Sequence, residues 1–544
     1  MRMRLPALTK RFKRCDFLTL SLLHHHPHLS LRSLNQIHAH LLVSGAIADP
    51  FAAAKLLSLV SLSGDLDHSR FLFSHLPRRS TFLYNSLIKT HLERDLFYEC
   101  LSLYKQMLAL GFSPNNYTFS FLLRACVGVS SLLDGKKFHA HIVRLGWESY
   151  DFVQNGLIHM YSSCGCVDSA RKLFDQSLSK DVITWTAMVH GYVKSGHISF
   201  ARAMFEQMPE RNAVSWSTMI TAYAQSGEFR EALKLFNEMQ VVGVCPNHAG
   251  IVGALSACGF LGALEQGKWI HAFVERNGME LDRILGTALI DMYAKCGYIE
   301  TAWQVFDAMI ERDVFAFTSM ISGLSNHGHS KKAVDLFDRM QVEGVRPNEV
   351  TFICVLSACG RMGLVERGRE IFKSMNEIYG IEPGVEHYGS LVDLLGRAGL
   401  FEEAKRIIKD MPMEPDSYVL GALLNACTVH GNMELGRQMV ESLAEFGLDH
   451  SGVHVLLSNM YASASRWEDV MKVRKRMEEK KVRKLPGCSM IEVDGMACEF
   501  VAGDRSHLQM EEILVIVKGM DKQMKSSGDD PYLMEFNDFQ IGVT

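Results

Sequence analysis

Small hydrogen-bonding side chains recur at two positions along this sequence. One set comprises Asn85, Asn155, Thr186, Ser217, Thr287 and Thr318. Each member has a polar partner 26 or 30 residues later, and these partners are Asn115, Asp181, Asn212, Asn247, Asp313 and Asn348. Amide, hydroxyl and carboxylate groups supply hydrogen-bond donors and acceptors. The chemistry that this pattern offers is therefore recognition of a partner with complementary donors and acceptors.

No residue motif typical of a catalytic site or a metal-binding site stands out in the sequence. The sequence contains no CxxC, and Cys164-Gly165-Cys166 is too tightly spaced for an ordinary zinc site. Its only His-x-Glu is His91-Leu92-Glu93, which has no CxxC to accompany it. Gly-rich strings such as GFLGALEQG fit turns better than phosphate loops. We therefore expect no catalytic residues, no cofactor and no metal.

The elements that position these residues are repeated units. A small residue precedes an aromatic one by four at Ala170, Ala201, Ala232, Ala302 and Ala333. The alanines are separated by 31 residues, or by 70 between Ala232 and Ala302, so units of about 31 and about 35 residues alternate. Periods of this size predict a solenoid, in which each unit buries its apolar face against its neighbours.

Residues 182–212 illustrate one unit. Trp185, Met188 and Tyr192 recur at helical spacing, which predicts an apolar stripe on a first helix. Ser195-Gly196 ends that helix, and a second helix follows until Pro209 stops it. Each unit is thus predicted to be a hairpin of two helices closed by a turn.

The polar positions fall at the ends of this unit. The last residue precedes the next helix, where helix capping explains Asn or Asp well. The fifth residue follows an aromatic residue inside the first helix, so capping explains it poorly. Polar groups stacked in register along one face can instead read unpaired bases, one base per unit. The second residue is usually apolar and could sandwich bases between units; examples are Phe82, Tyr117, Ile183, Val214, Ile284, Phe315 and Val350.

The composition is that of a folded protein without an electrostatic bias. The chain of 544 residues is 47% hydrophobic and 22% charged, with a formal net charge of −4. Any nucleic-acid binding must therefore rest on local placement rather than on bulk charge. No window is apolar enough for a transmembrane helix. Cysteines recur at one repeat position (Cys126, Cys258, Cys359 and Cys427), which indicates buried thiols in a reducing compartment.

The first fourteen residues, MRMRLPALTKRFKR, carry six basic residues and no acidic one. A basic, acid-poor start is typical of an organellar targeting segment. The alternative is a frayed basic terminus. We expect a mitochondrial location, with the chloroplast as the alternative.

Longer strings resemble plant pentatricopeptide repeat (PPR) proteins of the PLS type, in which P, L and S motifs alternate. These strings include GKKFHAHIVRLG, GKWIHAFVERNG, LIHMYSSCG and LIDMYAKCG, followed by LLNACTVHGNMELG and PGCSMIEVDGMACEF. The resemblance implies an all-α, right-handed superhelical α-solenoid of helix-turn-helix repeats. It divides the array 15–416 into the units 15–49, 50–80, 81–115, 116–150, 151–181, 182–212, 213–247, 248–282, 283–313, 314–348, 349–384 and 385–416. Extension (E) motifs are expected at 417–485 and an E+/PG-like tail at 486–544, with a probable β-hairpin around Asp494-Gly495.

The resemblance also implies a function. Such proteins bind single-stranded organellar RNA and select a cytidine for deamination to uridine by a DYW domain, whose zinc site needs His-x-Glu and CxxC. The sequence ends where that domain would begin, so we expect a specificity factor that recruits a deaminase in trans. The E motifs and the tail would dock it, although a structural cap on the solenoid is equally compatible with the tail.

The two-residue code of the family, carried over unit by unit, predicts a target. Asn85/Asn115 resembles a pyrimidine reader favouring cytidine, Asn155/Asp181 a uridine reader and Thr287/Asp313 a guanosine reader. Thr186/Asn212, Ser217/Asn247 and Thr318/Asn348 resemble adenosine readers. No recognised pair occurs at Ser120/Tyr150, Val252/Asp282, Ile353/Gly384, Ala54/Ser80 or Gly389/Asp416. The predicted site is 5′-Y-n-U-A-A-n-G-A-n-n, a few bases upstream of the edited cytidine.

Two other function classes remain open at this stage. RNA binding for transcript stabilisation, splicing or translation is one, although uniform units without extension motifs are typical of it. A protein-binding scaffold of the tetratricopeptide kind is the other. That repeat keeps a steady period of 34 residues and has no reason to repeat polar residues at two positions.

Overall fold

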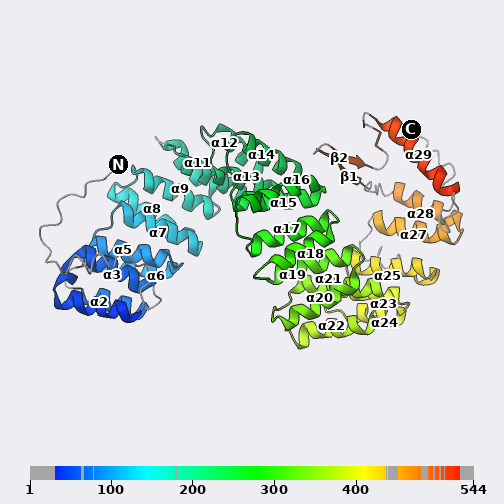
Figure 1. Cartoon of the computed structure of the whole chain (residues 1–544), viewed down its shortest axis with the longest axis horizontal. Helices are drawn as coiled ribbons and strands as arrows, with labels where there is room; N and C mark the ends of the chain where they lie inside the picture. Colours follow the sequence, from blue (N-terminus) through cyan, green and yellow to red (C-terminus); the bar gives the residue numbers. More distant parts are fainter. Residues whose placement is uncertain are drawn as a thin grey trace. The chain divides into compact units, whose positions relative to one another are not determined.

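A computed structural model describes residues 31–62, 66–76, 79–177, 180–436, 438, 451–479, 488–493, 496–501, 504–505, 507 and 509–526. The predicted targeting segment, the Asp494-Gly495 turn and the last eighteen residues lie outside the described residues. The chain divides into two compact parts, Met1–Ala254 and Leu255–Thr544. Each part is a stack of helices (Figure 1).

The N-terminal part begins with α2 (Leu31–Val43) and the short 3-10 helix η1 (Ala46–Ala48). Its helical pairs are α3 (Pro50–Leu62) with α4 (Leu66–His75), α5 (Thr81–Leu92) with α6 (Phe97–Ala109), α7 (Asn116–Val129) with α8 (Leu132–Leu145), α9 (Asp151–Ser163) with α10 (Val167–Gln176), α11 (Val182–Lys194) with α12 (Ile198–Gln207), and α13 (Ala213–Gln225) with α14 (Phe229–Val241). Helix α15 (His248–Leu261) contains the boundary between the two parts.

The C-terminal part continues the same pattern. It contains α16 (Leu264–Arg276), α17 (Arg283–Lys295), α18 (Ile299–Ala308), α19 (Val314–Asn326), α20 (Ser330–Val342), α21 (Glu349–Met362), α22 (Val365–Glu377), α23 (Val385–Arg397), α24 (Phe401–Asp410), α25 (Ser417–Val429), α27 (Ser451–Ser463), α28 (Trp467–Glu479) and α29 (Met510–Ser526). Strands β1 (Cys488–Val493) and β2 (Met496–Val501) lie between α28 and α29.

The two-helix unit predicted from the sequence is confirmed. From residue 50 to residue 451, the first helix of each unit begins at the first residue of that unit. Helix α11 ends at Lys194, and Gly196 follows with φ of +76°, a left-handed conformation that glycine adopts at little cost. Helix α12 ends two residues before Pro209, as expected. The all-α solenoid is therefore confirmed within each part, and the hand of the superhelix stays a prediction.

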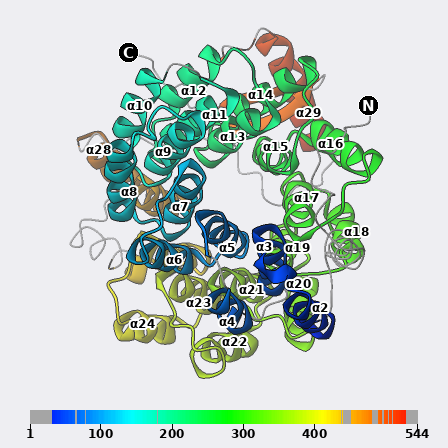
Figure 2. The ribbon, with the colours of Figure 1, turned by 90° about the vertical axis from the view of Figure 1, so that its left-hand side faces the viewer.

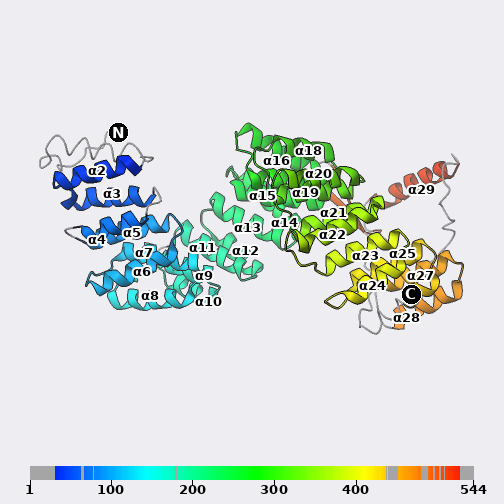
Figure 3. The ribbon, with the colours of Figure 1, turned by 90° about the horizontal axis from the view of Figure 1, so that it is seen from below.

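First helices pack side by side, and second helices form a separate layer behind them. In the N-terminal part α5, α7, α9, α11 and α13 contact one another in sequence order, and Figure 2 shows α6, α8, α10, α12 and α14 on their outer side. In the C-terminal part α17, α19, α21, α23 and α25 follow the same order, and Figure 3 shows it from α19 to α25. This layering puts the fifth residue of one unit next to the residues at the start of the following unit, as at Asn85 and Thr118.

Aromatic pairs join the second helix of one unit to the first helix of the next. Phe205 packs edge-to-face on Trp216, with ring centroids 4.9 Å apart, and Phe306 packs in the same way on Phe317 at 5.0 Å. The guanidinium of Arg211 covers the Phe205 ring at 4.9 Å. These phenylalanines are 0 to 2% exposed, and the alanines four residues before them are fully buried. The predicted aromatic stripe is thus the core between units.

Glycine allows the first helices to approach closely. A Cβ atom on Gly323 of α19 would lie 2.8 Å from the Cβ of Ala294 on α17. One on Gly191 of α11 would lie 2.6 Å from the Cβ of Ser162 on α9. Real Cβ atoms do not approach so closely, so a side chain at either glycine would push the two helices apart.

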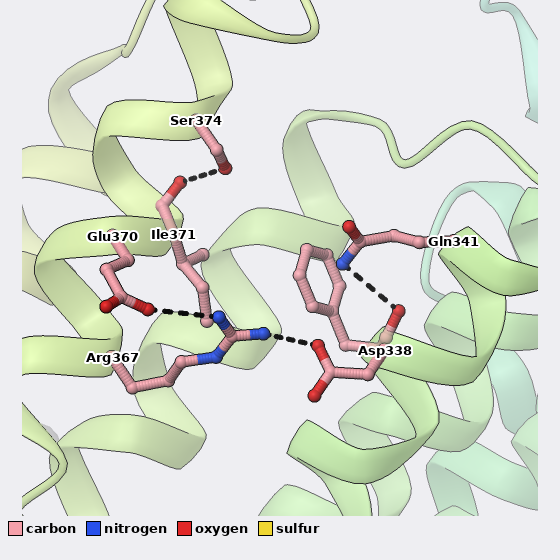
Figure 4. A network of polar contacts seen from close by, with 7 residues as sticks. Asp338, Gln341, Arg367, Glu370, Ile371 and Ser374 are labelled. Carbon is pink, nitrogen blue, oxygen red and sulfur yellow. Dashed lines mark hydrogen bonds and ion pairs between the residues drawn. The ribbon is translucent and has the colours of Figure 1, made fainter.

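Ion pairs connect second helices at the surface. The Arg367 guanidinium on α22 lies between Glu370 of its own helix, at 3.1 Å, and Asp338 on α20 (Figure 4). Arg339 lies 3.7 Å from Asp307 on α18, and Arg369 contacts Glu403 on α24. Because these pairs are partly exposed, each contributes little to stability, and salt screens them.

The repeated cysteines are core residues, as predicted. Cys126, Cys258, Cys359 and Cys427 are fully buried. Burial raises the pKa of Cys126 to about 12 and that of Cys359 and of Cys427 to about 11. These thiols therefore stay protonated and unreactive at neutral pH.

The predicted hairpin is confirmed near the C-terminus. Strands β1 and β2 pair antiparallel, from Cys488 opposite Val501 to Val493 opposite Met496. The connection between Val493 and Met496 has two residues, the length that a tight hairpin turn requires. None of the described helices is long and apolar enough to cross a membrane.

Replacing Gly323 with Ala tests the close approach of the first helices. The added Cβ must separate α17 from α19, so we expect Gly323→Ala to lower the free energy of unfolding by about 1–3 kcal/mol. Gly452→Ala is the matched control, because nothing lies within 4 Å of a Cβ there. Alanine stabilises an open helical site by up to about 1 kcal/mol. If urea denaturation shows that both variants are stabilised equally, the close contact is absent.

Candidate nucleic-acid interface

The last residue of each coded unit caps the helix that follows it. The Oδ1 atom of Asn212 accepts a hydrogen bond from the backbone amide of Ser215 at 2.9 Å. Asn115, Asp181, Asn247, Asp313 and Asn348 accept equivalent bonds at 2.8 to 3.1 Å. Capping is therefore confirmed at this position, and it holds each side chain in one orientation.

The fifth residue does not cap a helix. It lies one turn inside the first helix, where the hydroxyls of Thr186, Thr287 and Thr318 donate to the carbonyl four residues earlier at 2.6 to 2.7 Å. Ser217 contacts the carbonyl of Ala213 in the same way. The hydroxyl hydrogen is occupied in these bonds, so each oxygen retains lone pairs that can accept a further hydrogen bond.

In two of the predicted pairs, the fold brings the two members into hydrogen-bonding contact. Asn85 Nδ2 donates to Asn115 Oδ1 at 2.9 Å. Asn155 Nδ2 donates to Asp181 Oδ2 at 3.1 Å. The two members of each pair therefore form one polar site although they belong to opposite ends of their unit.

Two other pairs converge at a residue of the next unit, and the remaining two do not. The Thr351 hydroxyl oxygen lies 2.7 Å from that of Thr318 and 2.8 Å from Asn348 Oδ1, so it connects the two members of this pair. A Cβ on Gly250 would touch both Ser217 and Asn247, at 3.3 and 3.5 Å, so this pair also converges. Within the described residues no hydrogen bond joins the remaining two pairs, Thr186/Asn212 and Thr287/Asp313.

The sequence analysis missed the residue that connects these pairs. It is the third residue of the following unit, which is fully buried as Thr118, Thr184 or Thr351. Thr118 donates to Asn85 Oδ1 at 2.7 Å, and Thr184 donates to Asn155 Oδ1 at 2.5 Å. The available signal was a Ser or Thr three residues after the capping Asn or Asp, which is the spacing of a capping box.

Capping uses one side-chain oxygen of the last residue, so the other side-chain atom remains available to a ligand. An Asn that accepts with Oδ1 still presents its NH₂ group, a donor. An Asp that caps with one oxygen still presents an acceptor. Burial acts to raise the pKa of Asp181, but hydrogen bonds from Thr184 and Asn155 outweigh it, so the pKa lies below the usual value and the side chain is ionised at neutral pH.

The remaining donor of Asn and the remaining acceptor of Asp are complementary to groups on the Watson–Crick edges of unpaired bases. Adenine N1 and cytosine N3 are acceptors that suit Asn, whereas guanine N1–H and uracil N3–H are donors that suit Asp. A donor on Asn would therefore suit A or C, and an acceptor on Asp would suit G or U. The fifth residue is less accessible, since Asn85, Ser217 and Thr318 are less than 9% exposed.

Apolar second residues flank this polar row. Phe82, Tyr117, Ile183, Val214, Ile284, Phe315 and Val350 are 51 to 66% exposed. Exposed apolar groups of this size on successive first helices provide surfaces on which bases can stack. Stacking of bases between units requires second residues that are exposed in this way.

His91 of the single His-x-Glu sequence belongs to the core. It is 2% exposed, and its Nδ1 atom lies 2.9 Å from the carbonyl oxygen of Leu87. Burial lowers its pKa, so the ring is neutral. Within the described residues no group of three His, Cys, Asp or Glu side chains is placed to hold a metal ion.

Family models match most of the array. The model of the PPR repeat matches residues 155–182, 183–212, 287–314, 350–378 and 386–414, and that of the PPR repeat family matches 79–128, 211–249 and 312–361. The model of the E motif matches residues 430–492.

Individual proteins are similar over most of their length. Pentatricopeptide repeat-containing protein At5g66520 of Arabidopsis thaliana is 44% identical, with 92% of this chain and 82% of that protein covered. Pentatricopeptide repeat-containing protein At1g59720, chloroplastic/mitochondrial, of the same plant is 39% identical, with 92% and 76% covered. Among solved structures, PPR10 from maize is 17% identical, with 86% of each chain covered and a TM-score of 0.46.

Substitution of Asn212 tests the capping geometry. We expect Asn212→Ala to lower the free energy of unfolding by about 1 kcal/mol, because the amide of Ser215 loses its partner. Asn212→Asp keeps an acceptor at the same place and should change stability by less than about 0.5 kcal/mol. Urea denaturation of the three proteins measures both effects. An equal loss in the two variants would contradict capping through Oδ1.

Proposed function

We propose, since the chain belongs to the pentatricopeptide repeat family, that its units bind single-stranded RNA and that six of them each select one base. The observation that carries this proposal is the capping hydrogen bond of the last residue. It leaves a donor on Asn or an acceptor on Asp at the same place in each unit, beside an exposed apolar second residue. Such an arrangement favours a strand of unpaired bases over a protein partner.

The target follows from the order of the pairs along the chain. With one base per unit, the pairs that end in Asn115, Asp181, Asn212, Asn247, Asp313 and Asn348 read 5′-Y-n-U-A-A-n-G-A-n-n. Positions marked n correspond to units without a recognised pair. Binding is led by stacking and hydrogen bonds, which suits a protein whose formal charge is −4.

The role proposed for this binding is to select cytidines for C-to-U editing in an organelle. The match to the E motif at residues 430–492 supports it, because it lies C-terminal to the last match to the PPR repeat, which ends at residue 414. In this proposal a separate deaminase performs the chemistry and docks on the extension. An organellar location is supported by the names of three relatives, one of which carries "chloroplastic/mitochondrial" and two "chloroplastic". The basic first fourteen residues favour the mitochondrion, with the chloroplast as the alternative.

Selection of the full chain against a randomised single-stranded RNA pool tests the proposal. We expect enrichment of U-A-A-n-G-A, which can then be searched for upstream of edited cytidines in organellar transcripts. Enrichment of another sequence would support RNA binding and overturn the register of the units. A folded protein that enriches nothing at low salt would overturn RNA binding and favour the protein scaffold.

A single exchange at Asp313 tests the reading of one base. Asp313→Asn retains a helix cap but replaces an acceptor with a donor, so the preferred base should change from G to A at that position only. The change in preference should be on the order of 1–3 kcal/mol. Asp282→Asn is the matched control, because Asp282 also caps a helix but ends a unit whose fifth residue is Val252. Binding to RNAs that differ at one base measures both, and an unchanged preference in Asp313→Asn would contradict the assignment.

A further inference from the structure

The layer of second helices contains a pocket that none of the six residue pairs lines. It has a volume of about 550 Å³ and lies between α18 and α20, beside the end of α19. This volume falls within the range of roughly 300–1,000 Å³ that is typical of ligand sites. The lining includes the apolar residues Ile299, Trp303 and Leu336 and the charged residues Glu300, Lys332 and Asp335.

Trp303 stands at a position where other units carry a cation. It is the twenty-first residue of the unit 283–313. In the other short units (50–80, 151–181, 182–212 and 385–416) the twenty-first residue is Arg70, Arg171, Arg202 and Lys405. A half-buried aromatic ring, packed against Phe306 with centroids 6.0 Å apart, therefore replaces a basic side chain at this junction.

The basic residue at this position bridges second helices at two other junctions. Arg70 on α4 lies 2.9 Å from Glu99 on α6. At the same position of a longer unit, the Nε atom of Arg369 on α22 lies 2.9 Å from the Oε1 atom of Glu403 on α24. Both glutamates are the nineteenth residue of the following unit, which is a lysine on α20. Tryptophan and lysine cannot form this ion pair, so the bridge is absent between α18 and α20.

Two carboxylates of the pocket lack a cationic partner. Within the described residues no ion pair involves Glu300 of α18 or Asp335 of α20, and both side chains are exposed. Arg339 also lines the pocket, but its guanidinium already lies 2.7 Å from Glu343 and 3.7 Å from Asp307. These four carboxylates face only two cations, the arginine and the lysine of α20, so the local formal charge is −2 with histidine neutral.

This combination of groups suits an arginine side chain. A guanidinium stacks on an indole ring, and its N–H groups remain free to donate to carboxylates at the edge of the ring. Charge-assisted hydrogen bonds of this kind are stronger than neutral ones. Ile299 and Leu336, which are 8% and 2% exposed, provide an apolar surface for the methylene stem.

We propose that the pocket between α18 and α20 binds an arginine side chain of a partner protein, with the guanidinium stacked on Trp303 and hydrogen-bonded to Glu300 and Asp335. The partner thereby supplies the cation that the chain itself supplies through Arg70 or Arg369 at other junctions. The pocket belongs to second helices, whereas the paired polar residues belong to first helices and to the ends of units. This inference is therefore independent of the proposed RNA binding.

Titration of the full chain with N-acetyl-arginine methylamide, followed by the indole N–H signals in NMR, tests the inference. The chain contains six tryptophans, and the signal of Trp303 is the one that is missing in Trp303→Arg. We expect this signal to shift saturably, with a dissociation constant on the order of 1–10 mM for so small a probe. The citrulline analogue has the same shape without the charge and should bind at least about tenfold more weakly.

Variants of the lining identify the groups that bind the probe. Glu300→Gln and Asp335→Asn should each weaken binding about threefold to tenfold, and because both side chains are exposed the fold should be kept. Asp168→Asn is the matched control, since Asp168 holds the position of Glu300 in the unit 151–181, where Arg171 supplies a cation. It should leave binding unchanged.

Two further measurements separate a partner protein from a small molecule and from the RNA site. A blocked peptide Gly-Gly-Arg-Gly-Gly should bind at least as tightly as the methylamide, because a partner presents its arginine on an extended chain. Trp303→Arg restores the residue type of the other short units, so it should bind neither probe in saturation-transfer NMR and should keep its urea midpoint. Its affinity for RNA should equal that of the natural protein.

The outcomes decide the inference without reference to RNA. An absent shift, or equal binding of the citrulline analogue, overturns it. Binding that survives in Trp303→Arg, or that Glu300→Gln and Asp335→Asn leave unchanged, overturns it as well. Binding of the methylamide without binding of the peptide overturns the partner protein and assigns the pocket to a free guanidinium compound. Failure of the natural protein to bind RNA overturns the proposed function alone.

Discussion

One hydrogen bond, from the first turn of a unit's first helix to an Asn or Asp at the end of the preceding unit, determines the geometry of the paired polar sites. The amide group at the start of a helix needs an acceptor, and Asn or Asp supplies it. Because one oxygen is committed to this bond, the other atom of the side chain is held at the surface in a known orientation. The same bond that stabilises the helix thus decides whether a unit presents a donor, as at Asn212, or an acceptor, as at Asp313.

The spacing between the paired polar positions depends on how closely the first helices pack. Gly191 against Ser162 and Gly323 against Ala294 let neighbouring helices approach until backbone and Cβ atoms touch. Edge-to-face aromatic pairs such as Phe205 and Trp216 hold the second helix of one unit on the first helix of the next. A solenoid grows by repeating such contacts, so a regular row of sites follows from a regular core.

Ion pairs have a smaller role than close packing in arranging the helices. Ion pairs such as that of Arg367 with Asp338 join second helices on the side away from the polar row and are partly exposed.

The sequence by itself determined the units, their two helices, the aromatic core and the candidate pairs, because each depends on local periodicity or on residues that recur at a set interval. Ala201 with Phe205 and Ser195-Gly196 are examples, and so is the hairpin of Cys488–Val493 with Met496–Val501. Only the tertiary structure decided which atoms of the pairs are available. Thr118 and Thr184 link a fifth residue to a last residue across two units, and Tyr418 fills the space above Gly389. Such contacts join residues 29 to 33 positions apart through helix packing, and no local pattern specifies which side chain lies there.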